Sequence, residues 1–141
     1  MKRLLAFLLL GASSAQALLP AYKPERLRDL QAQGRTIVVY FTSQTCALCR
    51  QQEEVLERLG KEPDKSSPVF FQADFDAEEG LRQLWRVSAP STLVVFRGAD
   101  LLDRSTGLVS DDDVRTFVRD AVARSRGRPR ARTPRTVRSK R

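Results

Sequence analysis

The chain has 141 residues, a formal net charge of +8 and no histidine. Nine of its basic residues lie in residues 124–141, and without these nine and the two near the N-terminus, residues 18–123 carry a charge of −3. The folded part is therefore mildly acidic and long enough for one small domain. Two cysteines without histidine cannot fill the usual four positions of a zinc site.

Residues 1–17 have the pattern of a secretory signal peptide. Lys2 and Arg3 precede an apolar run over residues 4–10, and Ala15-Gln16-Ala17 is a small-x-small cleavage site. The run is shorter than the roughly 20 residues that span a bilayer. We expect cleavage after Ala17 and a periplasmic or secreted protein, where disulfides persist. An uncleaved membrane anchor is the alternative.

The next segments alternate helix and strand. Proline in the first turn and glycine at the end predict a short helix over residues 24–34. Residues 36–41 are a continuous β-branched and aromatic run, typical of a strand buried on both faces. A second helix is expected over residues 46–59, before a polar loop at 61–67. Its expected inward residues are Leu48, Val55, Leu56 and Leu59.

A strand over residues 69–74 and a helix over residues 76–85 follow. Asp76 is the expected N-cap of this helix, because a carboxylate can accept hydrogen bonds from the first free N–H groups. Its expected inward residues are Leu81, Leu84 and Trp85.

The last part begins with Ala89-Pro90 and a strand over residues 91–97. The turn at residues 98–100 and a second strand from 101 to about 108 predict a hairpin. Ser110 and the three acids after it suit the start of a final helix. The expected inward residues of that helix are Val114, Phe117, Val118, Ala121 and Val122. This order predicts an α/β domain over residues 18–123, with a mixed sheet and helices on both faces.

The tail, residues 124–141, is rich in arginine, proline, glycine, threonine and serine, and we expect it to be disordered. It is either a solubilising segment or an electrostatic contact to an anionic envelope surface. No aromatic residue interleaves the basic ones, so no nucleic-acid partner is expected.

Cys46 and Cys49 lie between a predicted strand and a predicted helix. Free backbone N–H groups and the helix dipole favour a thiolate at such a helix start. A cysteine three residues later lies one turn along and can form a disulfide with the first. Such a pair can transfer two electrons by thiol–disulfide exchange. A static disulfide is the alternative, although so short a loop stabilises less than a long one.

Over residues 22–124 the sequence resembles the thioredoxin family. The resemblance rests on a strand ending at Tyr40-Phe41 before Cys46-Ala47-Leu48-Cys49, on the Pro-led segment 87–96, and on the closing hairpin and helix. Pro90 follows Cys46 by 44 residues, the separation seen in thioredoxins. The resemblance implies a three-layer α/β/α fold with a mixed central sheet.

The family's chemistry implies roles for the matching residues. Cys46 would be the nucleophile and Cys49 the resolving thiol, with no cofactor and no metal. Ala89-Pro90 would carry a cis peptide bond beside the cysteines and pair with an extended substrate segment. An ordinary trans proline at a strand edge is the alternative. Thr45 and Ser88 would line the same groove. The implied partners are protein thiols and disulfides and a redox partner, with the protein acting as a monomer.

Three departures from the family pattern change what is expected. Tyr40 replaces a buried aspartate that assists proton transfer from the resolving thiol, and a tyrosine is a poor proton acceptor near neutral pH. Thr45 replaces a tryptophan, and Ala47-Leu48 replaces Gly-Pro between the cysteines. Without a histidine there, a reductase-like or intermediate redox poise is favoured.

We therefore predict an exported thiol–disulfide oxidoreductase acting on protein substrates. The alternative is a non-catalytic thioredoxin-fold binding or scaffold module, with a structural disulfide and a basic tail that tethers it to the envelope.

Overall fold

The computed structural model describes residues 19–62, 64 and 66–126. The predicted signal peptide and the tail from residue 127 onward lie outside this part of the chain. In the described residues, no helix is both long and apolar enough to cross a membrane.

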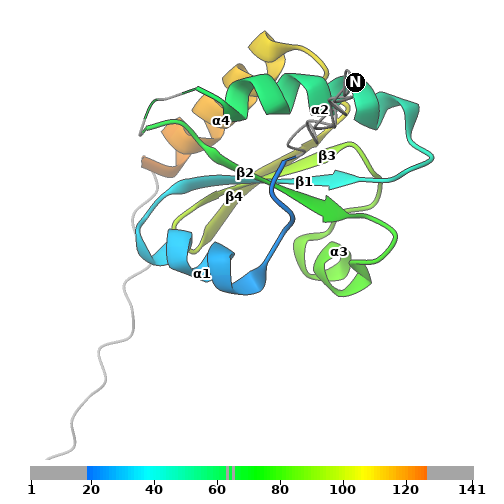
Figure 1. The fold of residues 1–141 in the computed structure, drawn as a ribbon. Coiled ribbons are helices and arrows are strands. Elements are labelled where there is room, and N and C mark those ends of the chain that lie inside the picture. Colours follow the sequence, from blue (N-terminus) through cyan, green and yellow to red (C-terminus); the bar gives the residue numbers. More distant parts are fainter. Residues whose placement is uncertain (1–18, 63, 65, 127–141) are drawn as a thin grey trace, which may run out of the picture.

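Four helices and four strands make up the described fold (Figure 1). The helices and strands alternate up to β3, and a hairpin then joins β3 to β4. The elements are α1 (Pro24–Ala32), β1 (Thr36–Thr42), α2 (Ala47–Gly60), β2 (Val69–Asp74), α3 (Glu79–Trp85), β3 (Thr92–Arg97), β4 (Asp100–Thr106) and α4 (Asp111–Arg126).

The strands form one mixed sheet in the order β2-β1-β3-β4. β1 and β2 are parallel, and the other neighbours are antiparallel. The register of β3 against β4 shifts between Val95 and Phe96, which marks a bulge or irregularity. Residues 20–22 extend the sheet beside β2, where the Tyr22 N–H donates to the Gln72 carbonyl oxygen at 2.7 Å.

Helices cover both faces of the sheet, so the predicted three-layer fold is confirmed (Figure 1). α2 and α4 pack on one face against Tyr40 and Leu93, among others. α1 and α3 pack on the other face, where Trp85 meets Phe41 and Phe96 edge to face. β1 is buried along nearly its whole length, as its apolar run predicts.

Several expected details of the helices are wrong. α3 begins at Glu79, because Asp74 Oδ1 accepts the N–H groups of Asp76 and Ala77 and holds a turn before the helix. Asp76 is therefore not the N-cap. Leu48 and Leu84, expected inward, are 41% and 72% exposed.

α4 continues to Arg126 and includes the first three residues of the predicted tail. Arg124 pairs with Asp103, and the Ser125 hydroxyl donates to the Val122 carbonyl oxygen at 2.7 Å. Cations in the last turn of a helix also interact favourably with its dipole. These contacts extend the ordered domain beyond residue 123.

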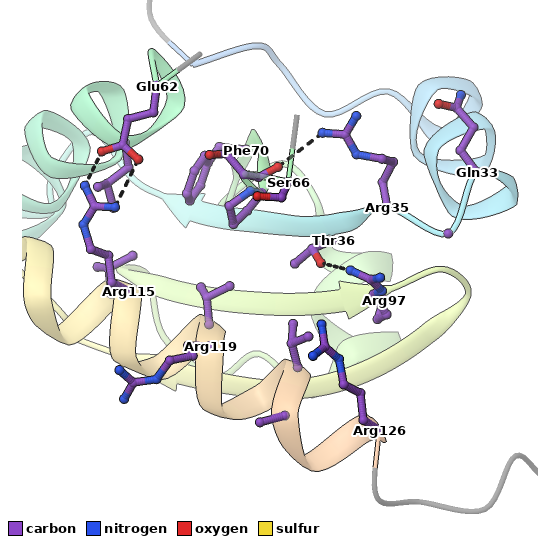
Figure 2. A pocket seen from close by; sticks show the side chains of 18 residues that line it. Gln33, Arg35, Thr36, Glu62, Ser66, Phe70, Arg97, Arg115, Arg119 and Arg126 are labelled. Atoms are coloured by element: carbon purple, nitrogen blue, oxygen red, sulfur yellow. Dashed lines mark hydrogen bonds and ion pairs between the residues drawn. The ribbon is translucent and has the colours of Figure 1, made fainter. Parts of the chain in front are cut away.

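The two ends of the sheet carry different features. The two cysteines follow the C-terminal end of β1. At the N-terminal end of β1, the sheet and α4 line a pocket (Figure 2).

Candidate active site

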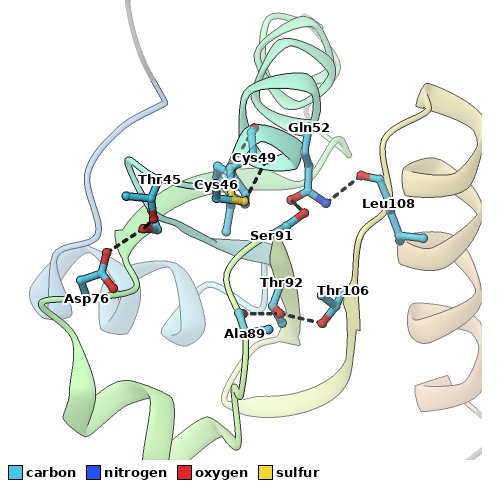
Figure 3. The surroundings of a disulfide bond; sticks show 12 residues. Thr45, Cys46, Cys49, Gln52, Asp76, Ala89, Ser91, Thr92, Thr106 and Leu108 are labelled. Atoms are coloured by element: carbon cyan, nitrogen blue, oxygen red, sulfur yellow. Dashed lines mark hydrogen bonds between the residues drawn. A yellow bond between two sulfur atoms is a disulfide. The ribbon is translucent and has the colours of Figure 1, made fainter.

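The cysteines lie where β1 ends and α2 begins (Figure 3). The Cys46 N–H donates to the Ser43 carbonyl oxygen at 3.1 Å, which closes the turn after the strand. Cys46 is the N-cap of α2, and it forms a disulfide with Cys49 across a Cα–Cα distance of 5.2 Å. The predicted order of strand, cysteine pair and helix is confirmed.

The two sulfur-bearing residues differ in exposure. Cys46 is half-buried, whereas Cys49 is only 1% exposed. Cys46 Sγ accepts a hydrogen bond from the Cys49 N–H at 3.1 Å. When the disulfide is reduced, this N–H and the positive end of the α2 dipole favour a thiolate at Cys46. Cys46 is thus the more accessible and the better stabilised of the two sulfurs.

Tyr40 joins the sheet to the cysteine turn from within the core. Its side chain is fully buried, and its hydroxyl donates to the Cys49 carbonyl oxygen at 2.8 Å. Burial raises the pKa of Tyr40 to about 12. The phenol is therefore protonated near neutral pH and acts as a hydrogen-bond donor, so it does not accept a proton from Cys49.

Gln52 is a fully buried amide one turn after Cys49. Its Nε2 donates to the Leu108 carbonyl oxygen at 2.7 Å, and its Oε1 accepts from Ser91 Oγ at 3.0 Å. Figure 3 shows this amide joining α2 to the two loops beside the cysteines. Sequence reasoning missed both Gln52 and Ser91. The available signal was a polar residue on the inward face of a helix, between Cys49 and Leu56.

The family model for thioredoxin matches residues 23–120 of this chain. The chain belongs to the thioredoxin family. Thioredoxin H5 of Arabidopsis thaliana is 28% identical over 88 residues, which span 62% of this chain and 73% of that protein.

Solved thioredoxin structures share the fold. Trxlp from Edwardsiella tarda superposes with a TM-score of 0.64 at 28% identity, over 70% of this chain and 96% of that chain. The thioredoxin of Fasciola hepatica has a TM-score of 0.59 at 29% identity, over 69% of this chain and 89% of that chain.

A thioredoxin domain with a CxxC pair at disulfide distance supports thiol–disulfide exchange. This member of the family is therefore a thiol–disulfide oxidoreductase, and its CxxC pair is Cys46 and Cys49. The family's general partners are protein disulfides.

The loop before β3 differs from the expectation that the family resemblance set. No peptide bond among the described residues is cis, so the Ala89–Pro90 bond is trans and the predicted cis bond is wrong. Ser91 makes the turn instead, with a left-handed backbone at φ +59°. Its N–H donates to the Phe41 carbonyl oxygen at 2.8 Å, and its own carbonyl oxygen accepts from the Gly107 N–H at 2.9 Å.

The residues predicted to bind substrate lie on two loops. Thr45 is exposed next to Cys46, and its hydroxyl is 3.3 Å from Ser43 Oγ. Ser43 Oγ also donates to Asp76 Oδ2 at 2.7 Å. Figure 3 shows Thr45 next to Cys46 and Ala89 next to Thr92, whose Oγ1 donates to the Ala89 carbonyl oxygen at 2.7 Å.

The rest of the second loop is also partly accessible. Ser88 is exposed, and Ala89 and Pro90 are half-buried. Substrate binding by Thr45, Ser88, Ala89 and Pro90 stays a prediction.

Proposed function

We propose that this protein is exported and reduces disulfides in protein substrates, with Cys46 as nucleophile and Cys49 as resolving thiol. The observation that carries the proposal is the difference between the two cysteines. Cys46 is half-exposed at the N-cap of α2, whereas Cys49 is buried behind it. A substrate sulfur can approach the first thiol, and the second is held for the intramolecular step.

The reaction transfers two electrons in two exchanges. The Cys46 thiolate attacks one sulfur of the substrate disulfide, and the other substrate sulfur leaves as a thiolate and takes a proton from water. Cys49 then loses its proton and attacks Cys46 Sγ. The mixed disulfide breaks, the substrate gains its second thiol, and the Cys46–Cys49 disulfide forms.

Glu53 is our candidate for the group that receives the Cys49 proton. It lies four residues after Cys49 on α2, so the two side chains share a helix face. The side chain is half-buried, and burial, followed by repulsion from Glu57, raises the pKa of the carboxyl group. A carboxylate with a raised pKa is a better proton acceptor near neutral pH.

Glu53→Gln tests this role through the pH dependence of insulin disulfide reduction. We expect a lower rate of insulin reduction and the loss of that limb of the pH profile which reports the Glu53 carboxyl group, because the amide cannot take a proton. Glu54→Gln, at an exposed position of the same helix, is the matched control. An unchanged pH profile in Glu53→Gln would exclude Glu53.

The two residues between the cysteines support a reducing or intermediate redox potential of the pair. Ala47 and Leu48 supply no cation or imidazole to stabilise a thiolate. We therefore expect a midpoint potential between about −270 and −180 mV, the range from thioredoxin to protein disulfide isomerase. Equilibration of the purified protein in glutathione buffers measures this value.

The decisive experiment combines a trapping variant with an activity assay. Cys49→Ser should accumulate mixed disulfides on Cys46, and the Cys46→Ser/Cys49→Ser double variant should accumulate none. The unaltered protein should reduce insulin disulfides. A Cys46–Cys49 disulfide that stays oxidised at potentials far below that of the glutathione pool would contradict the proposed reductase function and favour the scaffold alternative.

Export rests on the sequence of residues 1–17. We expect the exported protein to begin at Leu18 and to act as a monomer, and its basic tail to contact an anionic envelope surface. N-terminal sequencing of protein from the periplasmic or secreted fraction tests cleavage. Deletion of residues 127–141 should reduce envelope association, and unchanged association would refute the tail contact.

A further inference from the structure

The pocket in Figure 2 lies at the opposite end of β1 from the cysteines. Its volume is about 720 Å³, within the range of small-molecule sites. The walls come from the starts of β1 and β2, the end of β3, the end of α2 with the loop after it, and one side of α4. This site takes no part in the thiol chemistry described above.

The floor of the pocket is apolar. Leu59, Phe70, Val114 and Val118 line it, and each is buried in the core between the sheet and the two helices above it. Val122 extends this apolar surface along α4 and is half-buried. Such a surface favours the apolar part of a ligand over water.

The rim is strongly basic. It contains one glutamate, Glu62, and five arginines, which gives the lining a formal charge of +4. By contrast, residues 18–123 as a whole carry −3. Glu62 pairs with Arg115 at one end of the pocket (Figure 2). The other arginines in the lining are Arg35, Arg97, Arg119 and Arg126.

Arg35 and Arg97 are held in place beside each other. Thr36 and Arg97 are register partners, and the Gly98 N–H donates to the Arg35 carbonyl oxygen at 3.0 Å. Arg97 Nη1 donates to Thr36 Oγ1 at 2.8 Å, and Arg35 Nη2 donates to the Ser67 carbonyl oxygen at 3.2 Å. A guanidinium has five N–H donors, so each arginine keeps several for a ligand. Figure 2 shows Arg126 on the same side of the pocket.

We propose that this pocket binds an amphipathic anion, an alkyl chain that ends in a carboxylate or phosphate. The head group would lie among Arg35, Arg97 and Arg126, and the chain along the apolar floor. A purely apolar ligand would take the guanidinium groups out of water without a partner, which is unfavourable. A small inorganic anion would contact only the guanidinium groups and would leave the rest of the cavity unfilled. The tail of this chain is a poor occupant, since residues 127–141 hold seven basic residues and no acid.

Isothermal titration with decyl phosphate below its micelle concentration tests the proposal on the full mature chain. We expect saturable one-to-one binding that weakens as salt is added, because the head group binds by charge. Decyltrimethylammonium, with the same chain and the opposite charge, and inorganic phosphate, with no chain, should each bind at least tenfold more weakly.

Variants locate the site. Arg35→Gln/Arg97→Gln should weaken decyl phosphate binding at least tenfold, since charge-assisted contacts from two guanidiniums are lost. Arg126→Gln, at the end of α4, should weaken it without affecting the sheet. Arg26→Gln/Arg104→Gln removes the same charge from exposed positions outside the pocket and should leave binding unchanged. Insulin reduction should be unchanged in all three variants.

Several outcomes would overturn the proposal. One is equal binding of the phosphate and ammonium probes, and another is equal loss in the control variant. Binding to phosphatidylglycerol vesicles without binding to monomeric decyl phosphate would replace the pocket with a membrane-contact surface. Binding of an acidic peptide alone would replace it with a protein-docking surface. Neither result would bear on the thiol chemistry at the other end of β1.

Discussion

Among the described residues, those with a left-handed backbone are Arg86, Ser91 and Gly107 at the cysteine end of the sheet and Gly34 and Gly98 at the pocket end. A side chain in this region costs about 1–2 kcal/mol, and glycine avoids that cost. The cysteine end also contains the fully buried amide of Gln52. This conformational cost is therefore borne by two side chains on the cysteine side, by Arg86 as the C-cap of α3 and by Ser91 in the loop before β3. The pocket end has an arginine rim instead, in which Arg97 and Arg126 are exposed and Arg35 is half-buried.

The largest expected effect is a loss of thiol–disulfide exchange at the cysteine end with no change in ligand binding at the pocket end. Cys46→Ser removes the attacking thiolate, and we expect insulin reduction to fall about a thousandfold or more. Binding of decyl phosphate should not change, because the pocket lies at the other end of β1. Turbidity of reduced insulin measures the first quantity, and titration calorimetry measures the second. Residual activity within tenfold of the unaltered protein would contradict the assignment of Cys46.

Gln52→Leu tests how strongly the buried amide holds the cysteine end together. The substitution leaves Ser91 Oγ and the Leu108 carbonyl oxygen without their partner, and we expect a loss of about 1–3 kcal/mol in the free energy of unfolding. Urea unfolding of the oxidised protein measures it. Gln51→Leu, at an exposed position, should change stability by less than about 0.5 kcal/mol.

A double-mutant cycle between Gln52→Leu and Ser91→Ala sharpens this result. Direct contact predicts a coupling energy of about 0.5–3 kcal/mol. Additive effects of the two substitutions would show that the hydrogen bond contributes little.

Substitutions at left-handed positions of the two ends should change the free energy of unfolding in opposite directions. Arg86→Gly relieves a side chain at φ +53° and should raise the free energy of unfolding by about 0.5–1 kcal/mol after the added chain entropy of glycine. Gly34→Ala places a methyl group at φ +66° and should lower it by about 1 kcal/mol. The added methyl meets no atom within 4 Å, so any loss reports backbone conformation alone. Changes of the same sign in both variants would contradict this difference.

The smallest expected effect is a pH dependence at Glu53. Burial, followed by repulsion from Glu57, raises the pKa of this carboxyl group in the folded state. The folded protein therefore favours the protonated form, and that contribution is present at low pH and is lost as pH rises through the raised pKa. Glu53→Gln should thus stabilise the protein more at pH 7 than at pH 4. Urea unfolding at both pH values tests this, with Glu54→Gln as control.

Much of the fold was predictable because the local pattern of apolar residues in these segments agrees with their burial in the folded domain. The apolar run of β1 is buried as expected, and the cysteine pair lies between strand and helix. Leu48 and Leu84 were placed wrongly because helical spacing alone does not show where a helix end leaves the core. Asp74 rather than Asp76 holds the turn before α3, a choice that depends on where β2 ends.

The candidate site was predictable only in part. Counting residues from Cys46 located the loop of Pro90, but a count does not specify a peptide isomer or the backbone of Ser91. The link from Ser91 to Gln52 joins residues 39 positions apart, and no local pattern predicts it. The arginine rim likewise combines Arg35, Arg97 and Arg126, which only the folded sheet and α4 bring together.

The edges of the sheet bear on how the protein behaves at high concentration. Residues 20–22 cover the outer side of β2, whereas β4 is the last strand on its side in the described part of the chain. Exposed edges can recruit strands from other molecules and lead to aggregation. Here Asp100, Asp103 and Arg104 place charges along β4, and the irregular register beside Val95 distorts it. Both features oppose growth of the sheet from one molecule into the next.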